Sequence, residues 1–166
     1  DNLACEEPLE IRLNSTPLTV TMRTPGHDLE LAAGFLLTEG IIQSAAQIAD
    51  LRPASPNHTI DKNRIEVVLR DISCEANHLQ RNFFAASSCG ICGKTSIEAV
   101  RLRGLRAPGG GFHVDPQMLC CMPHRLRDEQ VIFGRTGGLH AAALFNEDGE
   151  LLVVREDIGR HNAVDK

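Results

Sequence analysis

Two cysteines separated by two residues form the most chemically distinctive segment of this sequence. Cys89 and Cys92 lie in SSCGICGK, and each cysteine is followed by a glycine. We expect a helix to begin near Lys94, which would place both thiols near the positive end of a helix dipole and beside a cation. Such surroundings favour the thiolate, the form that attacks sulfur. The glycines would let a bulky partner approach the backbone closely.

Three kinds of chemistry fit this pair: half of a zinc site, a redox dithiol, or a carrier for an activated sulfur atom. A zinc site needs two further ligands at suitable spacing, and neither the adjacent Cys120 and Cys121 nor His113 and His124 complete a recognisable pattern. A thioredoxin-like unit would place a strand ahead of the pair, and that arrangement is missing. We interpret the remaining cysteines as small core residues, at positions 5, 74, 120 and 121.

A second cluster of polar residues lies near the end of the chain, in GRTGGLHAAALF and VREDIGRHNAVDK. A loop at 135–138 would offer backbone donors and an arginine to a phosphate. Arg160 and His161 open a predicted helix, another position that favours anions, and Glu156 and Asp157 could accept hydrogen bonds from a base or a sugar. Each residue alone is compatible with a solvated hairpin end, but their grouping on one hairpin predicts a binding pocket.

The first elements that position these residues are strands and a helix. Alternating residues predict strands over 9–13 and 18–23, joined by a turn in NSTP. The helix that follows has Thr24 as its expected N-cap, Pro25 as its first residue and Gly40 as its stop. Its apolar residues repeat at helical spacing, which predicts an amphipathic helix.

The rest of the chain is expected to alternate between helices and strands. Asp115 is the expected cap of a long helix, which Pro123 should kink. Asp148 and Gly149 are a typical pair for a hairpin turn. The predicted elements are a short helix over 43–51, a strand over 64–70, a helix from Lys94, a helix over 116–133, a hairpin over 139–157 and a short helix over 159–166.

The length of 166 residues suits one domain or two small ones. The glycine-rich segment 106–112 predicts a boundary between residues 1–108, an N-terminal α+β subdomain with the CxxC loop, and residues 109–166. The last helix has no stop signal, so we expect the sequence to continue beyond Lys166. A formal net charge of −5 argues against a nucleic-acid partner. No segment is typical of a signal peptide or a membrane span, and the cysteine spacing predicts reduced thiols in the cytoplasm.

Several motifs together resemble the FdhD/NarQ family of formate dehydrogenase accessory proteins. CGICG, RTGGLHAAALF and REDIGRHNAVDK occur in the family's order, and EEPLEIRLN and LAAGFLLTEGII match its N-terminal pattern. The resemblance implies a sulfur carrier that takes persulfide sulfur from a cysteine desulfurase. The sulfur would pass to the molybdenum or tungsten bis-guanine-dinucleotide cofactor, which then enters formate dehydrogenase. Cys89 matches the persulfide-bearing cysteine, and Cys92 its partner, which would either resolve the persulfide or relay sulfur. The resemblance also implies a homodimer.

The same resemblance implies that residues 109–166 begin a cytidine-deaminase-like three-layer α/β/α domain, truncated at its C-terminal side. His161 lies in HNA, so the glutamate of a deaminase's H-x-E motif is absent, and neither deamination nor a zinc site is expected. A nucleotide-shaped pocket remains, with predicted cofactor-binding residues Arg135, Thr136, Gly137, Gly138, His140, Glu156, Asp157, Arg160 and His161. Two alternatives stay open: a cofactor-binding chaperone without sulfur transfer, and a CxxC thiol-disulfide oxidoreductase.

Overall fold

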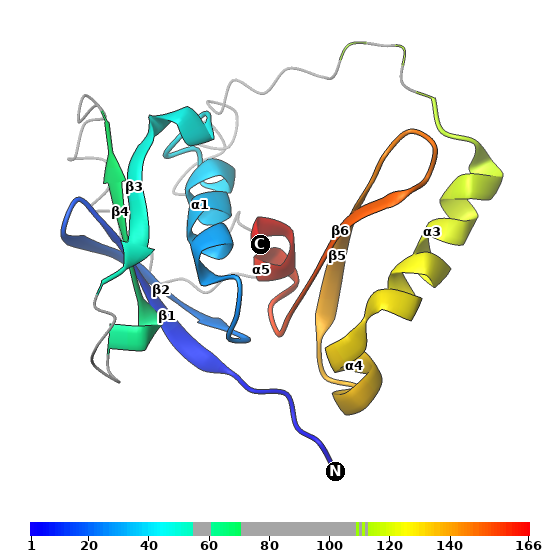
Figure 1. Ribbon diagram of the computed structural model, residues 1–166, viewed down its shortest axis with the longest axis horizontal. Helices are drawn as coiled ribbons and strands as arrows, with labels where there is room; N and C mark the ends of the chain where they lie inside the picture. The colour runs from blue at the N-terminus through cyan, green and yellow to red at the C-terminus, as the bar shows by residue number, and fades with distance from the viewer. Residues whose placement is uncertain (55–60, 71–108, 110, 112) are drawn as a thin grey trace, which may run out of the picture.

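The computed structural model describes residues 1–54, 61–70, 109, 111 and 113–166 (Figure 1). The CxxC pair Cys89 and Cys92, Cys74 and the helix predicted from Lys94 lie outside the described residues. The strands are β1 (Glu7–Leu13), β2 (Thr16–Arg23), β3 (Ile48–Pro53), β4 (Arg64–Leu69), β5 (His140–Phe145) and β6 (Leu151–Asp157). The helices are α1 (Asp28–Thr38), α3 (Pro116–Glu129), α4 (Val131–Thr136) and α5 (Arg160–Asp165), with 3-10 turns at Ala45–Gln47 and Asp61–Asn63.

The N-terminal half forms a four-stranded mixed sheet with the strand order β2-β1-β4-β3. β1 pairs antiparallel with β2 and parallel with β4, and β3 pairs antiparallel with β4. Alternate residues of β1 and β4 point to one face of the sheet, where α1 covers them (Figure 1). The resulting core consists mainly of Leu9, Ile11, Leu13, Leu31, Ala32, Leu36, Ile42, Ile65, Val67 and Leu69. The predicted α+β class is confirmed.

The C-terminal half is built on the predicted hairpin, in which β5 and β6 pair antiparallel. Helices α3 and α4 lie on one side of the hairpin, and α5 lies between the hairpin and α1 (Figure 1). The turn is longer than the predicted two residues, because Gly149 N donates to Asn146 O at 3.0 Å and Asn146 N donates to Glu150 O at 3.0 Å. Gly149 has φ +75°, which favours glycine. The cytidine-deaminase-like architecture stays a prediction.

The start of α1 differs from the prediction. The helix begins at Asp28 after His27, and Thr24 does not cap it. Gly26 and His27 have positive φ angles and break the helical path after Pro25. Thr24 is instead buried, and its hydroxyl accepts a hydrogen bond from Ile158 N at 3.1 Å. A contact with a residue far along the chain therefore overrides a local capping pattern.

The end of α1 is as predicted. Gly40 has φ +71°, its amide donates to Leu37 O at 3.0 Å, and Ile41 N donates to Leu36 O at 2.9 Å. This is the hydrogen-bond pattern of a Schellman motif, in which glycine relieves the strain of the left-handed backbone.

Two further helix predictions need correction. Of the short helix expected over 43–51, only the 3-10 turn Ala45–Gln47 forms, and β3 follows because it pairs with β4 as an edge strand. The helix expected over 116–133 is divided: Asp115 caps α3 as predicted, accepting from Gln117 N at 2.7 Å, but the break is at Gln130 and not at Pro123.

The two halves touch where α1 meets α5. A Cβ added to Gly34 of α1 would lie 1.9 Å from the carbonyl oxygen of Asp165 in α5. Only glycine permits such a close helix–helix approach. The boundary predicted between residues 108 and 109 stays a prediction.

Candidate functional site

The residues predicted to bind a cofactor flank one end of the β5–β6 hairpin. His140 is the first residue of β5, Asp157 is the last residue of β6, and the two are cross-strand partners. The junction between α4 and β5, which contains the segment 135–138, therefore lies at the same end of the hairpin as the junction between β6 and α5 (Figure 1). The antiparallel register brings together two motifs that are separated in the sequence.

This end of the hairpin carries two arginine and two histidine side chains that have no partner among the described residues. Arg135, His140 and Arg160 are exposed and His161 is half-buried. Within the part of the chain that the structure describes, none of these four side chains makes a hydrogen bond, an ion pair or a ring contact. The other described arginines all make one: Arg12, Arg23, Arg52, Arg64, Arg70, Arg125, Arg127 and Arg155. An exposed arginine without an internal partner is suited to binding an anionic group such as a phosphate.

The segment 135–138 is not the open loop that the glycines suggest. Arg135 and Thr136 form the last turn of α4, and Gly137, with φ +69°, is its left-handed C-cap. The Gly137 amide donates to Phe133 O at 2.7 Å, and the Gly138 amide donates to Thr136 Oγ1 at 3.3 Å. Both amides are therefore used within the helix end, so a phosphate at this position would depend on the Arg135 side chain.

Glu156 lies next to this region with both carboxylate oxygens occupied. Oε2 accepts a hydrogen bond from Ile132 N at 2.8 Å, and Oε1 accepts one from Phe133 N at 2.7 Å. These amides belong to the first turn of α4, whose formal N-cap residue, Gln130, makes no capping contact with its side chain. The carboxylate of a residue on β6 thus caps a helix that begins 25 residues earlier in the chain.

Asp157 is fully buried and accepts four hydrogen bonds. Oδ1 accepts from Gly159 N at 2.8 Å and from Asn162 Nδ2 at 3.0 Å, and Oδ2 accepts from Thr24 N at 3.0 Å and from Lys166 Nζ at 2.7 Å. The carboxylate therefore joins β6, α5 and the segment that follows β2. A ligand could use Asp157 only by displacing these contacts.

Lys166 and Asn162 belong to this network but are not among the site residues predicted from the sequence. The Lys166 side chain is almost completely buried. Only 2% of its side chain is exposed, and Nζ also donates to Thr24 O at 2.8 Å and to Glu156 O at 3.4 Å. A buried ion pair of this kind leaves no periodic signal in the sequence, because its members come from elements that meet only in the folded chain.

An open pocket of about 280 Å³ lies beside the hairpin. Two of its lining residues contact Glu30: Arg155 Nε lies 2.6 Å from Glu30 Oε2, and His27 Nδ1 lies 3.2 Å from Glu30 Oε1. The hydrogen bond from Arg155 holds the pKa of Glu30 below its ordinary value. Of the predicted cofactor-binding residues, this pocket includes only Glu156. Its lining residues are Pro25, His27, Glu129, Ile132, Val154, Arg155, Glu156 and Lys166.

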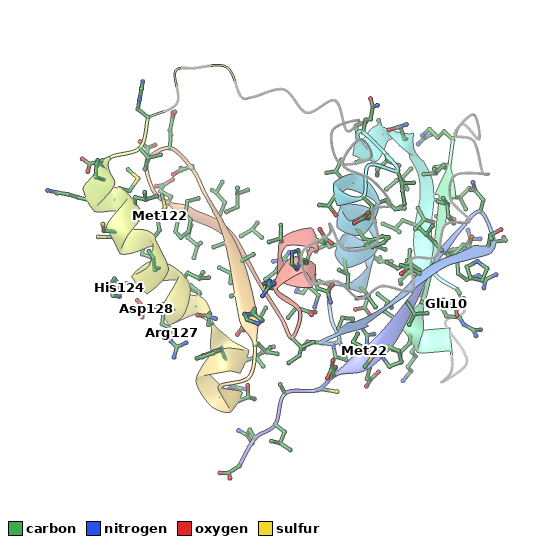
Figure 2. All side chains as sticks on the ribbon, turned by 180° about the vertical axis from the view of Figure 1, so that it is seen from behind. Glu10, Met22, Met122, His124, Arg127 and Asp128 are labelled. Atoms are coloured by element: carbon green, nitrogen blue, oxygen red, sulfur yellow. The ribbon has the colours of Figure 1, made fainter. Side chains whose placement is uncertain are left out.

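The cysteines that the structure describes are not core residues, contrary to the prediction. Cys5, Cys120 and Cys121 are free and exposed. Helix α3 has no buried residue, and Figure 2 shows Met122 on its hairpin side and His124 on its outer side. With so narrow a contact to the hairpin, α3 leaves most of its surface to solvent, including both of its cysteines.

The described residues contain neither a metal-binding cluster nor a membrane-spanning helix. No three or more histidine, cysteine, aspartate or glutamate side chains in the ranges that the structure describes are grouped so that they could hold a metal ion. In the same ranges, no helix has both the length and the apolar character needed to cross a bilayer.

Comparison with known proteins gives the context for this geometry. A sequence profile of the FdhD/NarQ family matches residues 4–166. The chain belongs to the FdhD/NarQ family. The family match covers the CxxC pair, the 135–138 segment and the 155–161 segment within one alignment.

Relatives at close to half sequence identity carry a common name. Sulfur carrier protein FdhD of Streptomyces avermitilis is 48% identical over 177 residues, and that of Mycobacterium tuberculosis is 49% identical over 174 residues. The protein of the same name from Thermoplasma volcanium is 40% identical over 173 residues. Each alignment covers 100% of this chain but only 61%, 63% and 61% of the respective relative. The chain thus spans about three fifths of the length of these curated relatives.

A solved structure supports the fold. The crystal structure of a proposed formate dehydrogenase accessory protein from Desulfotalea psychrophila aligns with a TM-score of 0.68 at 24% identity. The alignment covers 98% of this chain and 56% of that protein.

Proposed function

We propose that this protein is a sulfur carrier in the maturation of formate dehydrogenase. In this proposal Cys89 accepts persulfide sulfur from a cysteine desulfurase and the protein then transfers the sulfur to the molybdenum or tungsten bis-guanine-dinucleotide cofactor. The observation that carries the proposal is the match of the whole chain, at 48–49% identity, to proteins named sulfur carrier protein FdhD. The homodimer that the family resemblance implies belongs to the same proposal.

The first step is an exchange between two sulfur sites. The Cys89 thiolate attacks the terminal sulfur of the desulfurase persulfide, a new S–S bond forms on Cys89, and the desulfurase cysteine leaves as a thiolate. No oxidant is needed, because one S–S bond replaces another. The glycines at positions 90 and 93 leave space around the backbone for the partner protein.

Release of the sulfur depends on Cys92 in one of two ways. If Cys92 resolves the persulfide, its thiolate attacks the inner sulfur of Cys89, a Cys89–Cys92 disulfide forms, and the terminal sulfur leaves as hydrosulfide with the two electrons that the thiols supply. If Cys92 relays sulfur, it attacks the terminal sulfur and becomes the persulfide itself. Quantifying the disulfide after delivery distinguishes these routes.

The cofactor is the substrate of this reaction, and the cationic end of the hairpin is the part of the described chain that fits it. Arg135, His140, Arg160 and His161 have no partner there among the described residues, and the phosphates of a guanine dinucleotide carry a charge complementary to that of the two arginines. Because Glu156 and Asp157 are occupied by backbone and side-chain donors, we assign the anion contacts to Arg135, His140, Arg160 and His161.

The proposed carrier role is tested by intact-protein mass spectrometry after incubation with a cysteine desulfurase and cysteine. We expect a gain of one sulfur atom that a reductant removes and that Cys89→Ser abolishes. The matched control is a Cys120→Ser, Cys121→Ser double variant, which removes two exposed thiols from α3 and should leave the gain intact. If the control loses the sulfur and Cys89→Ser retains it, the assignment to Cys89 is wrong.

The unpaired cationic residues also favour a second candidate, a chaperone that holds the cofactor without transferring sulfur. This protein would bind the cofactor but gain no sulfur in the desulfurase assay. The oxidoreductase alternative predicts that Cys89 and Cys92 cycle through a disulfide with a thioredoxin-type partner, again without a persulfide.

A further inference from the structure

Glu156 occupies an unusual position for a residue in a motif that is rich in predicted ligand contacts. Its carboxylate points to α4 and accepts the Ile132 and Phe133 amides at 2.8 and 2.7 Å. Consecutive strand residues face opposite sides of a sheet, so Glu156 and Asp157 serve different neighbours. Glu156 holds α4 on one side, and Asp157 holds α5 and the segment after β2 on the other.

Helix α4 depends on such an anchor. It has six residues and no buried side chain, and an isolated helix of that length is unstable in water. Its C-terminal end is tied to the hairpin because the chain continues into β5. Its N-terminal end is held by Glu156 and by the Arg127 guanidinium of α3, which lies 3.8 Å from the centre of the Phe133 ring. A carboxylate at a helix N-terminus also interacts favourably with the helix dipole.

We infer that Glu156 is a positioning residue that fixes α4 and thereby holds Arg135 ready for a phosphate of the cofactor. This inference rests on the proposed function, because it assigns the residue that organises that same binding site. It differs from a direct role for Glu156 in accepting a hydrogen bond from the base or sugar. The two roles make opposite predictions for a ligand that lacks phosphates.

The experiment compares GDP and guanosine as probes of the wild-type protein and its variants by isothermal titration calorimetry. Positioning predicts that Glu156→Gln, which keeps one acceptor but loses the charge, weakens GDP binding by on the order of fivefold, and that Glu156→Ala weakens it by on the order of tenfold. Guanosine affinity should not change in either variant. The matched control is Glu147→Gln, which removes the same charge from an exposed residue in the hairpin turn and should not affect either ligand.

Hydrogen exchange of the segment 130–138 provides a readout without ligand. The variants at Glu156 should raise its exchange rate several-fold and leave the segments of β1, β4 and α1 unchanged. The inference is overturned if exchange in 130–138 does not change, if GDP binds the variants as tightly as the wild type, or if guanosine affinity falls as much as GDP affinity. If the wild type binds neither probe while exchange responds as expected, the cofactor site of the proposed function fails and the structural role of Glu156 in fixing α4 stands.

Discussion

The buried ion pair of Asp157 and Lys166 should be the most sensitive point of the fold outside the apolar core. Asp157 is 0% exposed and the Lys166 side chain 2% exposed, with Oδ2 and Nζ 2.7 Å apart. Removing one partner of a buried pair leaves the other charge without compensation and typically destabilises a protein by about 3–5 kcal/mol. We therefore expect substitutions of Asp157 or Lys166 that change few atoms to lower the free energy of unfolding by a large amount.

The contacts that remain in each single variant determine which of the two is more destabilised. In Lys166→Met, Asp157 retains the donors Thr24 N, Gly159 N and Asn162 Nδ2, so we expect a loss near the lower end, about 3 kcal/mol. In Asp157→Asn, the Lys166 ammonium retains only carbonyl oxygens, at 2.8 and 3.4 Å, and the new amide places a donor against donors. This variant should lose about 4–5 kcal/mol.

Urea unfolding at pH 7, followed by circular dichroism, measures these losses. The double variant should be less destabilised than the sum of the single variants, with a coupling energy of at least about 1 kcal/mol. The matched control is Asp50→Asn, because Asp50 pairs with Arg52 on the surface with 42% and 60% of the side chains exposed, and its loss should stay within about 0.5 kcal/mol. An Asp157→Asn loss below about 1 kcal/mol, or strictly additive single variants, would refute the reasoning.

Two further predictions concern the contact between α1 and α5. Gly34→Ala should destabilise the protein by about 2–3 kcal/mol in urea unfolding, because its Cβ would meet the Asp165 backbone at 1.9 Å. The control is Gly134→Ala, which has open space around its Cβ and should be neutral or slightly stabilising. Equal effects of the two substitutions on stability would contradict the close contact between α1 and α5. Burial raises the pKa of Asp165 to about 6, against a hydrogen bond from Thr38 and with a smaller contribution from Glu39. The folded state then holds the proton between about pH 4 and 6 while the unfolded state releases it, so stability falls as pH rises through this window. Asp165→Asn should abolish that fall and stabilise the protein above pH 6 by about 1 kcal/mol, after allowance for partial solvent exposure, with no gain below pH 4. A gain in stability of equal size above pH 6 and below pH 4 would show that Asp165 is not the source of the pH dependence.

The sequence predicts the elements whose signals are local. Alternation along β1, β2 and β4 and the capping residues Asp115 and Gly40 act within a few residues, and the structure confirms them. The failures occur where distant contacts decide. Thr24 has the chemistry of an N-cap, but its hydroxyl and amide are used by residues 157–158, and 48–51 become a strand because β4 offers an edge.

The same distinction between local signals and distant contacts applies to the candidate site. The sequence locates the polar motifs and the register of the hairpin brings them to one end, as their pairing predicts. The sequence does not distinguish the polar residues that meet a ligand from those that hold the site together. Arg135 and Arg160 have no partner among the described residues, whereas Glu156 and Asp157 are saturated by donors from elsewhere in the chain.

The difference between residues available to a ligand and residues that hold the site together has a physical basis in the hairpin. A short two-stranded hairpin is only marginally stable alone, so the helices that present its cationic residues must be fixed by specific contacts. Two adjacent carboxylates at the end of β6 provide them, one on each face, and each satisfies donors that would otherwise be open to solvent or buried without a partner. Both carboxylates accept hydrogen bonds from within the chain, and the Asp157 carboxylate is also paired with the Lys166 ammonium. Arg135 and Arg160 have no partner among the described residues, so their guanidinium groups are the charged groups at this end of the hairpin that an anionic ligand can bind.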